Sequence, residues 1–327
     1  MRYPERMHAL TFDRFGGPEV LTWREVADPV LAPGHALVRI AAAGLNFADI
    51  YRRRGDYFMD ATPPWILGYE GAGIVEAVAD GESGIAVGDR VGFADAPRAN
   101  AELVAVPVDR LVPLPDKVAF DQAAAALLQG LTAQYLVADS YRVAVGETAL
   151  VHAAAGGVGL LLVQMLKRKG AQVIALASSE TKRVAAREAG ADEALGYEGD
   201  WLAAVRAATG GRGVDIVYES VGPTLAMSMA AARIGGAVVF YGFAGGNPEP
   251  VDPRQLMDRS LTLTGGDLWN ILNSAEQRRR RAADLLGMVA DGTLEVRIAE
   301  RVPMAEGARA HALLQGRGVV GKIVLAV

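Results

Sequence analysis

Residues 151–164, VHAAAGGVGLLLVQ, set a group of small residues between two apolar runs. TALVHAA, which leads into them, is typical of a buried strand, and GVGLLLVQMLKRKG has the composition of a helix that ends in basic residues and glycine. Residues 154–159, AAGGVG, match the pattern G-x-G-x-x-G with alanine in the first position. A strand, a glycine turn and a helix in this order predict a dinucleotide-binding Rossmann unit.

The small residues of this turn have separate expected roles. Gly156 and Gly157 would let the backbone approach a pyrophosphate, and Gly159 would let the helix pack closely on the strand. The helix N-terminus, which includes Val158, would direct N–H groups and the helix dipole at the anion. The alternative is a glycine-rich turn that serves packing alone.

The end of the second strand indicates which nucleotide is bound. An NAD site places an acidic residue there to bind the ribose diol. This chain has Ser178 and Ser179 instead, followed within a turn by Lys182 and Arg183, a set that suits the 2′-phosphate of NADPH. Glu180 is close to the acidic position, but we expect it in the first turn of the next helix, where the dipole favours a carboxylate that points away. The pattern favours NADPH over NADH.

Strands and helices alternate through the middle of the chain, which predicts a doubly wound parallel sheet with helices on both faces, an α/β fold. The expected strands are 148–154, 172–177, 192–197, 214–222, 237–242 and 261–265. The expected helices are 157–170, 180–190, 201–211 and 224–236.

The regions on either side have a different composition. Short strands at 36–45, 68–78 and 87–93, broken by Gly and Pro, predict a small β-rich barrel-like domain, and 119–136 reads as a bridging helix. A long helix at 274–292 precedes a tail strand at 318–327 that we expect to return to the first domain. We therefore expect a catalytic domain over 1–125, a nucleotide-binding domain over 126–266 and a C-terminal return over 267–327.

Composition excludes several classes of protein. The chain has 327 residues, no cysteine and a net charge of −5, which excludes disulfides, thiolate nucleophiles and Cys-ligated zinc and argues against nucleic-acid binding. Four basic residues at 278–281 are interpreted as a solvated helix face, flanked by Glu276 and Asp284. With no apolar signal core and no long apolar run, we expect a cytoplasmic protein with no membrane partner.

The order of a small β domain, a Rossmann unit and a returning tail resembles the medium-chain dehydrogenase/reductase superfamily. Within it the chain is similar to the zinc-free NADPH:quinone oxidoreductase branch, the zeta-crystallin-like enzymes. The matching segments are FGGPEVL (15–21), GLNFADIYRRRGDY (44–57), GYEGAGIV (68–75), GDRV (88–91), QGLTAQYL (129–136), HAAAGGVG (152–159) and YESVG (218–222). The resemblance implies a GroES-like barrel domain beside the Rossmann domain, NADPH as cofactor and a quinone as substrate.

The resemblance also implies the loss of a metal. Zinc enzymes of the superfamily carry a Cys ligand in G-x-C-x-x-D and a His ligand in G-H-E-x-x-G, where this chain has Asn46 and Tyr69. Two segments depart from the branch pattern: 98–107, and the apolar, glycine-rich loop 241–246. Both are expected to line the substrate site, so the resemblance is least informative about the acceptor.

The resemblance assigns the substrate site to Asn46, Asp49, Tyr51 and Tyr57. The Asn46 amide would donate to the nicotinamide or to a substrate oxygen. The two tyrosines would form an aromatic wall with hydroxyl groups, unless they serve ordinary packing. Asp49 is expected to order the loop rather than to act as a base.

The remaining expected cofactor contacts come from several parts of the chain. Thr132 and Tyr135 would lie near the nicotinamide ribose. Tyr197 would pack on the adenine or touch the 2′-phosphate, or else be a core tyrosine of an edge strand. The loops after two later strands add Val221, Gly242 and Phe243, and Arg317 either reaches the cofactor from the tail or is a surface cation.

Without a Lewis acid, alcohol oxidation is not expected, whereas a quinone or an enone is already electrophilic. We therefore expect NADPH-dependent quinone reduction. One alternative is reduction of the C=C bond of α,β-unsaturated carbonyls, and another is a non-catalytic NADPH-binding structural or sensor protein. The apolar segment LTLTGG (261–266) corresponds to an edge strand that pairs between subunits in related enzymes, which implies a homodimer.

Overall fold

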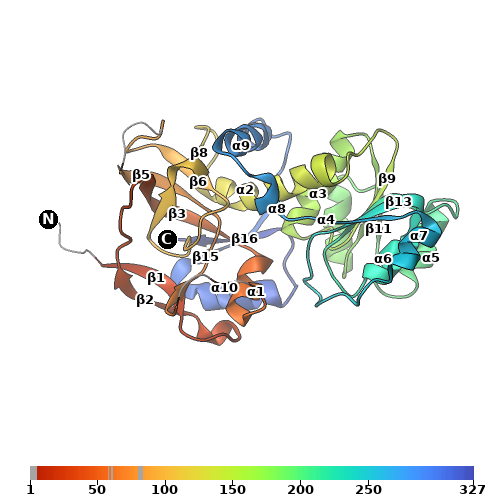
Figure 1. Ribbon diagram of the computed structural model, residues 1–327, viewed down its shortest axis with the longest axis horizontal. Coiled ribbons are helices and arrows are strands. Elements are labelled where there is room, and N and C mark those ends of the chain that lie inside the picture. Colours follow the sequence, from red (N-terminus) through yellow and green to blue (C-terminus); the bar gives the residue numbers. More distant parts are fainter. Residues whose placement is uncertain (1–5, 58, 60–61, 80–83) are drawn as a thin grey trace. The chain divides into compact units, whose positions relative to one another are not determined.

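The computed structural model describes residues 6–57, 59, 62–79 and 84–327. The chain forms two compact units, one of residues 1–128 and 272–327 and the other of residues 129–271 (Figure 1). Among the described residues, no helix combines the length and the apolar character needed to cross a lipid bilayer. Helix α2 (Phe120–Tyr135) carries the chain from the first unit into the second.

The first unit is built on a seven-stranded sheet in which β7 pairs with β3, beside the path β15-β16-β3-β5-β6-β8. Its strands are β3 (His35–Leu45), β5 (Gly71–Val78), β6 (Arg90–Phe93), β7 (Leu103–Pro107), β8 (Val112–Pro113), β15 (Ile298–Pro303) and β16 (Lys322–Ala326). A smaller sheet contains β2 (Thr22–Ala27), β1 (Arg6–Phe12) and β4 (Trp65–Ile66). Small residues let the central strands approach closely: a Cβ on Gly73 of β5 would lie 1.9 Å from the carbonyl oxygen of Arg39 in β3.

The chain end completes this sheet. Strand β16 pairs antiparallel with β3, with Ile323 opposite Leu45 and Ala326 opposite Ala42. Two elements that precede it, β15 and the helix α10 (Gly307–Gln315), were not predicted from the sequence. Helix α1 (Phe47–Arg54) directly follows β3.

The long helix α9 (Ala275–Ala290) lies where it was predicted, but its arginine run does not form a fully solvated face. Arg278 is buried, with one Nη 3.1 Å from Asp95 Oδ2 and 2.9 Å from the carbonyl oxygen of Leu272. Arg279 donates to the carbonyl oxygens of Leu111 and Val108. The interpretation of 278–281 as solvent-facing was therefore wrong for these two arginines, which bind α9 to the segment around β8.

The second unit is a six-stranded parallel sheet in the order β11-β10-β9-β12-β13-β14, the doubly wound arrangement of a Rossmann domain. Its strands are β9 (Thr148–Val151), β10 (Gln172–Leu176), β11 (Glu193–Leu195), β12 (Val214–Glu219), β13 (Ala232–Phe240) and β14 (Thr262–Gly265). Its helices include α3 (Gly157–Arg168), α4 (Glu180–Glu188), α5 (Trp201–Ala208), α6 (Leu225–Ala231), α7 (Pro253–Arg259) and α8 (Leu268–Ile271). The predicted α/β class is confirmed.

One predicted helix was too long. The segment 224–236 was expected to be helical throughout, but α6 ends at Ala231 and residues 232–236 begin β13. Gly235 has φ +68, and the pairing of β12 with β13 shifts register between Val214 and Ile216. An irregular strand with a glycine bend carries no clear period-2 pattern, which explains the error.

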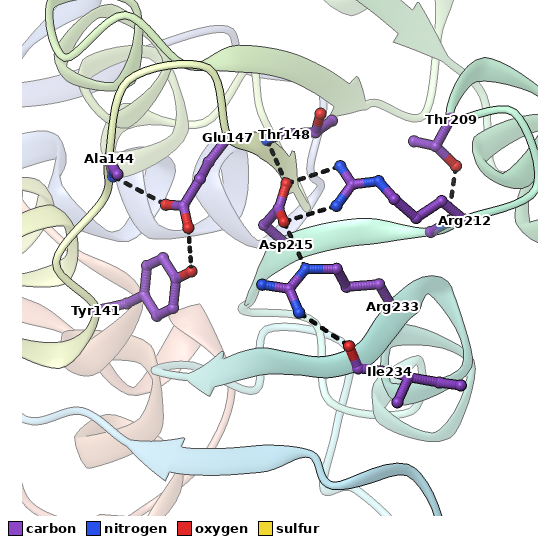
Figure 2. Close-up of polar contacts among 10 residues, drawn as sticks. Tyr141, Ala144, Glu147, Thr148, Thr209, Arg212, Asp215, Arg233 and Ile234 are labelled. Carbon is purple, nitrogen blue, oxygen red and sulfur yellow. Dashed lines mark hydrogen bonds and ion pairs between the residues drawn. The ribbon is translucent and has the colours of Figure 1, made fainter.

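Ion pairs and hydrogen bonds connect residues at the amino-terminal ends of β9 and β12 in the parallel sheet (Figure 2). Asp215 is buried at the start of β12 and accepts two hydrogen bonds from the guanidinium of Arg212, at 2.8 and 2.9 Å. It also accepts from Arg233 Nε at 2.6 Å and from the backbone N–H of Thr148 at 2.8 Å, and these hydrogen bonds hold the Asp215 pKa well below its usual range despite burial.

Candidate nucleotide and acceptor site

The turn between β9 and α3 brings the start of the helix close to the end of the strand. Gly156 caps α3, and its N–H donates to the carbonyl oxygen of Ala153 at 2.8 Å. A Cβ on Gly159 would lie 2.5 Å from that same carbonyl oxygen, and one on Gly157 would meet the Gln129 side chain. The helix can therefore reach the strand end only with glycine here, and its first N–H groups, including that of Val158, are placed at the carboxyl edge of the sheet.

Strand β10 ends beside a group of polar side chains. Ser179 caps α4, and its hydroxyl accepts from the backbone N–H of Lys182 at 3.4 Å. The Lys182 ammonium lies 3.4 Å from Ser178 Oγ. The structure thus brings together two exposed hydroxyls and one ammonium, the three groups predicted to meet a 2′-phosphate.

The competing carboxylate at this strand end is occupied by arginines. Glu180 lies in the first turn of α4, where it accepts from Arg183 Nε at 2.8 Å and also pairs with Arg187. These hydrogen bonds lower the Glu180 pKa, and the one from Arg183 has the larger effect. Arg183 is held on its other side by Glu198, at 2.7 Å. Because Arg183 is shared by two carboxylates, Lys182 is the better candidate for the phosphate contact.

Two loops at the ends of β12 and β13 support each other. Glu219 Oε1 accepts from the N–H groups of Val221 and Gly222, at 2.6 and 3.1 Å, and the N–H of Gly245 donates to the Val221 carbonyl at 2.7 Å. A Cβ on Gly222, which has φ +100, would lie 1.9 Å from the carbonyl oxygen of Gly246. Gly242 and Phe243 therefore lie on a loop that is fastened to the one carrying Val221.

A buried hydrogen-bond chain that was not predicted from the sequence adjoins residues 154–159, the phosphate turn. The Ser228 hydroxyl donates to Glu219 Oε2 at 2.5 Å, so its oxygen accepts from His152 Nε2, at 2.9 Å. The other ring nitrogen, Nδ1, then accepts from the Tyr197 hydroxyl, at 3.2 Å, and that hydroxyl accepts from the Ala153 N–H at 3.0 Å. Burial lowers the His152 pKa, while the charge of the Glu219 carboxylate acts in the opposite direction. His152, which directly follows β9, was the available signal, but it lies in a motif that was interpreted only for its glycines.

This chain of hydrogen bonds changes the expected role of Tyr197. Its hydroxyl contacts the protein interior, and burial raises its pKa. The hydroxyl holds the Ala153 N–H at the start of the turn formed by residues 154–159, so it is not directed at a 2′-phosphate, and packing of the ring on the adenine stays a prediction. The two α2 residues expected at the ribose, Thr132 and Tyr135, are both buried, and a Cβ on Gly266 would lie 2.7 Å from the Tyr135 hydroxyl.

In the first unit, Asn46 and Asp49 form a capping box at the start of α1. The Asp49 carboxylate accepts from the Asn46 N–H at 2.9 Å, which ties the loop to the first turn of the helix. Burial raises the Asp49 pKa, while the positive charge of Arg52 acts in the opposite direction. The geometry places Asp49 in the ordering role.

Asn46 also belongs to a buried polar cluster that sequence analysis did not identify. Its amide nitrogen donates to Glu70 Oε2 at 3.0 Å and to the Gly44 carbonyl at 3.2 Å, and its oxygen accepts from Lys322 Nζ at 2.7 Å. Lys322 and Glu70 are themselves 2.6 Å apart and fully enclosed. The amide donors are thus directed at protein acceptors, which differs from the expected donation to nicotinamide or substrate.

The two predicted tyrosines lie on and just after α1. Tyr51 is half-buried, with its ring centroid 6.3 Å from that of Phe47. Tyr57 is half-buried and contacts the guanidinium of Arg52, which lies 4.9 Å from its ring centroid. Arg317 is exposed in the left-handed region, φ 55, at the end of α10.

Comparisons with known proteins agree with this architecture. Residues 32–145 match the alcohol dehydrogenase GroES-like domain, and residues 157–286 match the zinc-binding dehydrogenase family. A quinone oxidoreductase of Pseudomonas aeruginosa is 40% identical over 97% of this chain and 98% of its own length. The chain belongs to the quinone oxidoreductase family of medium-chain dehydrogenases/reductases. The family resemblance read from the sequence is therefore confirmed.

Two further relatives are also similar to this chain over nearly its whole length. The structure of Escherichia coli quinone oxidoreductase complexed with NADPH is 34% identical, has a TM-score of 0.95 and covers 98% of this chain and 100% of its own. A 2-haloacrylate reductase from a Burkholderia species is 34% identical over 97% of this chain and 98% of its own length. The family thus includes reductases of both kinds of acceptor considered above.

The residues present do not fit the zinc that one family name implies. Asn46 stands where the zinc enzymes have their Cys ligand, and its oxygen already accepts from the Lys322 ammonium. A dication at this oxygen would lie beside a buried positive charge. Within the described part of the chain, no group of three His, Cys, Asp or Glu side chains is placed to hold a metal ion.

Proposed function

We propose that this protein reduces quinones with NADPH. The observation that carries the proposal is the pairing of the phosphate turn at Gly156 with the Ser178 and Lys182 side chains, in a chain of the quinone oxidoreductase family. The backbone turn suits a pyrophosphate, and the hydroxyl–ammonium pair suits a 2′-phosphate. NADPH, when bound, supplies the hydride equivalent for the reduction.

The chain's own residues would hold and orient the cofactor. Gly157 and Val158 would provide N–H groups for the pyrophosphate, Gly156 would let the backbone approach it, and Lys182 with Ser178 and Ser179 would select the phosphorylated ribose. Val221, Gly242, Phe243, Thr132 and Tyr135 are proposed for the nicotinamide side, with Arg317 as a further contact. The fastened loops after β12 and β13 keep this side rigid, which reduces the entropy lost on binding.

The acceptor would bind in the first unit. Tyr51 and Tyr57 are half-buried and offer aromatic faces to a quinone ring. Asn46 is held by Glu70 and Lys322, so we assign it the role of fixing the loop that carries these tyrosines. Protons for the reduced oxygens would come from water.

The direct test follows NADPH oxidation by absorbance with para-benzoquinone, phenanthrenequinone and a simple enone, beside the same reactions with NADH. Turnover with quinones and a strong preference for NADPH is expected. Equal use of NADH would contradict the assignment of Ser178 and Lys182 and would return Glu180 to the ribose. Tight NADPH binding without turnover of any acceptor would favour a non-catalytic role.

A second candidate is reduction of the C=C bond of α,β-unsaturated carbonyls. The observation in its favour is the 2-haloacrylate reductase that shares 34% identity over nearly the whole chain. Activity on a straight-chain enone with none on either quinone would establish it. We also propose that the protein works in the cytoplasm.

We also propose a homodimer that pairs through β14. This strand is the edge of the parallel sheet, and two of its four residues are exposed. Light scattering at micromolar concentration should report a dimer, and Thr262→Lys, which puts like charges at the paired edges, should shift it toward monomer. Thr22→Lys, at an exposed position of the edge strand β2, is the matched control. A wild-type monomer under these conditions would rule out the pairing.

A further inference from the structure

Three consecutive arginines of α1 have three different surroundings. Arg54 is exposed. Arg53 is buried, and it donates from Nε to the Gly16 carbonyl at 3.2 Å and from Nη2 to Gln315 Oε1 at 2.6 Å. Arg52 is only 4% exposed, yet its Nε and Nη1 have no hydrogen-bond partner among the described residues. A buried guanidinium with unpaired donors is costly and requires a physical reason.

Two tyrosine rings cover this guanidinium. Its central carbon lies 3.7 Å from the ring centroid of Tyr69 and 4.9 Å from that of Tyr57. These contacts stabilise the positive charge through the ring faces but leave the buried N–H groups of Nε and Nη1 without acceptors. Asp49 lies one turn earlier in α1, and its carboxylate also keeps one oxygen without a partner, so the two side chains do not form a hydrogen-bonded ion pair.

The Arg52 guanidinium is connected to the buried cluster of Asn46, Glu70 and Lys322 through adjacent residues of the chain. Tyr69, which stacks on Arg52, directly precedes Glu70, which accepts from Asn46. Tyr57 and Tyr69 are both half-buried, so neither residue is enclosed in the core. The unpaired donors of Arg52 are thus held between two rings suited to an aromatic acceptor.

We propose that Arg52 determines specificity by binding an oxyanion substituent of the acceptor, a carboxylate or sulfonate carried beside the electrophilic ring or double bond. This inference rests on the proposed function and names its substrate class: anionic quinones and unsaturated acids. The planar N–H edge of a guanidinium matches two oxygens of such a group, and the tyrosine faces receive the apolar part. The acceptor's charge then completes the hydrogen bonding that the protein leaves open.

The test compares a neutral and an anionic acceptor of the same ring system, naphthoquinone and naphthoquinone sulfonate. Arg52→Met should lower kcat/KM for the sulfonate by about 30-fold and change that for naphthoquinone by less than about threefold, as expected for loss of a charge-assisted contact. Arg54→Met removes the same charge from an exposed position of the same helix and should change neither value.

Each contrary pattern overturns the proposal. An equal loss with both acceptors would show that Arg52 only supports the two tyrosines. No loss with either would show that it contacts no acceptor. A raised KM for NADPH with both acceptors would assign the guanidinium to a cofactor phosphate. If Arg52→Met does not fold, Arg52→Lys serves instead: it keeps the charge but not the planar fork, and should cost about tenfold with the sulfonate alone.

A binding measurement separates this inference from the proposed function. Naphthalene sulfonate, which accepts no hydride, is titrated calorimetrically into the NADP⁺-loaded protein and its Arg52→Met variant. Weaker binding to the variant by about 30-fold supports the inference even if no acceptor is turned over. Equal binding, with quinone turnover intact, would sink the inference and leave the proposed function standing.

Discussion

Single residues in the first unit show how a lost metal position is filled by protein charge. Lys322, at the start of β16, reaches Asn46 across 276 residues of chain and pairs with Glu70 in an enclosed site. Burial lowers the Lys322 pKa, and the neighbouring Glu70 carboxylate acts against that shift. Each charge is tolerated only because the other is present, together with the Asn46 amide.

Breaking this pair should therefore cost more than removing both charges. Lys322→Met alone is expected to lower the free energy of unfolding by about 3–5 kcal/mol, because it leaves Glu70 buried and uncompensated. The double variant Lys322→Met with Glu70→Gln should recover a large part of that loss. Urea unfolding is the measurement, and Glu76→Gln, in an ion pair with Arg39 on the exposed face, should cost less than about 1 kcal/mol. A full loss in the double variant would contradict this account.

At the second unit, Lys182 is expected to decide cofactor choice. Lys182→Ala should raise the KM for NADPH by about 10- to 100-fold and leave that for NADH unchanged, since only NADPH carries the 2′-phosphate. Steady-state kinetics with saturating quinone checks this. Arg187→Ala removes the same charge from α4 at a residue paired with Glu180, and should affect neither cofactor. An equal rise for both nucleotides would assign Lys182 to the pyrophosphate.

Among the elements, the β9–α3 connection depends on close approach of helix and strand. Ala153 has φ 47 at the end of the strand, and its N–H is held by Tyr197 through the buried chain to His152 and Glu219. The turn at residues 154–159 is thus held by a hydrogen-bond chain of side chains: Tyr197, which follows β11, His152, Ser228 of α6 and Glu219 of β12. Glycines alone do not build it.

Gly159 gives a direct test of this close approach. Gly159→Ala should destabilise the Rossmann unit by about 1–3 kcal/mol and weaken NADPH binding, because the added Cβ would lie 2.5 Å from the Ala153 carbonyl oxygen. Gly287→Ala in α9 is the control: nothing lies within 4 Å of its added Cβ, so it should stabilise by about 0.5–1 kcal/mol. Thermal unfolding and NADPH titration report both effects. Unchanged NADPH binding in Gly159→Ala would contradict the expected role of the turn.

The whole molecule should lose stability in mild acid because it encloses neutral histidines in both units. Burial, aided by the positive charge of Arg53, lowers the His311 pKa to about 3, and burial likewise lowers that of His152. Below about pH 6.5 these histidines bind protons in the unfolded chain but not in the folded chain. For His311 this lowers the free energy of unfolding by about 1.4 kcal/mol per pH unit as the pH falls from about 6.5 toward about 3, and the shift at His152 acts in the same direction.

Replacing one of these histidines should flatten the profile. His311→Leu is expected to reduce the loss between about pH 6.5 and about pH 5 by about 2 kcal/mol, because one proton-linked group is removed. Neither ring nitrogen of His311 has a hydrogen-bond partner in the described structure, so the variant should fold normally at neutral pH. Urea unfolding across this range is the measurement, and His35→Gln, at a half-buried residue, is the control. An unchanged slope would mean that His311 protonates in the folded state.

Local sequence determined the Rossmann unit, the phosphate turn and the hydroxyl–ammonium pair after β10, because a strand, a glycine turn and a helix are written in consecutive residues. It also determined the family, through motifs spread over the chain. Tertiary structure decided the rest: the Lys322–Glu70–Asn46 cluster, the inward hydroxyl of Tyr197, and the burial of Arg52 between two rings. These partners lie far apart along the chain, and only packing brings their charges and donors within hydrogen-bond distance, so residue type and spacing alone do not reveal them.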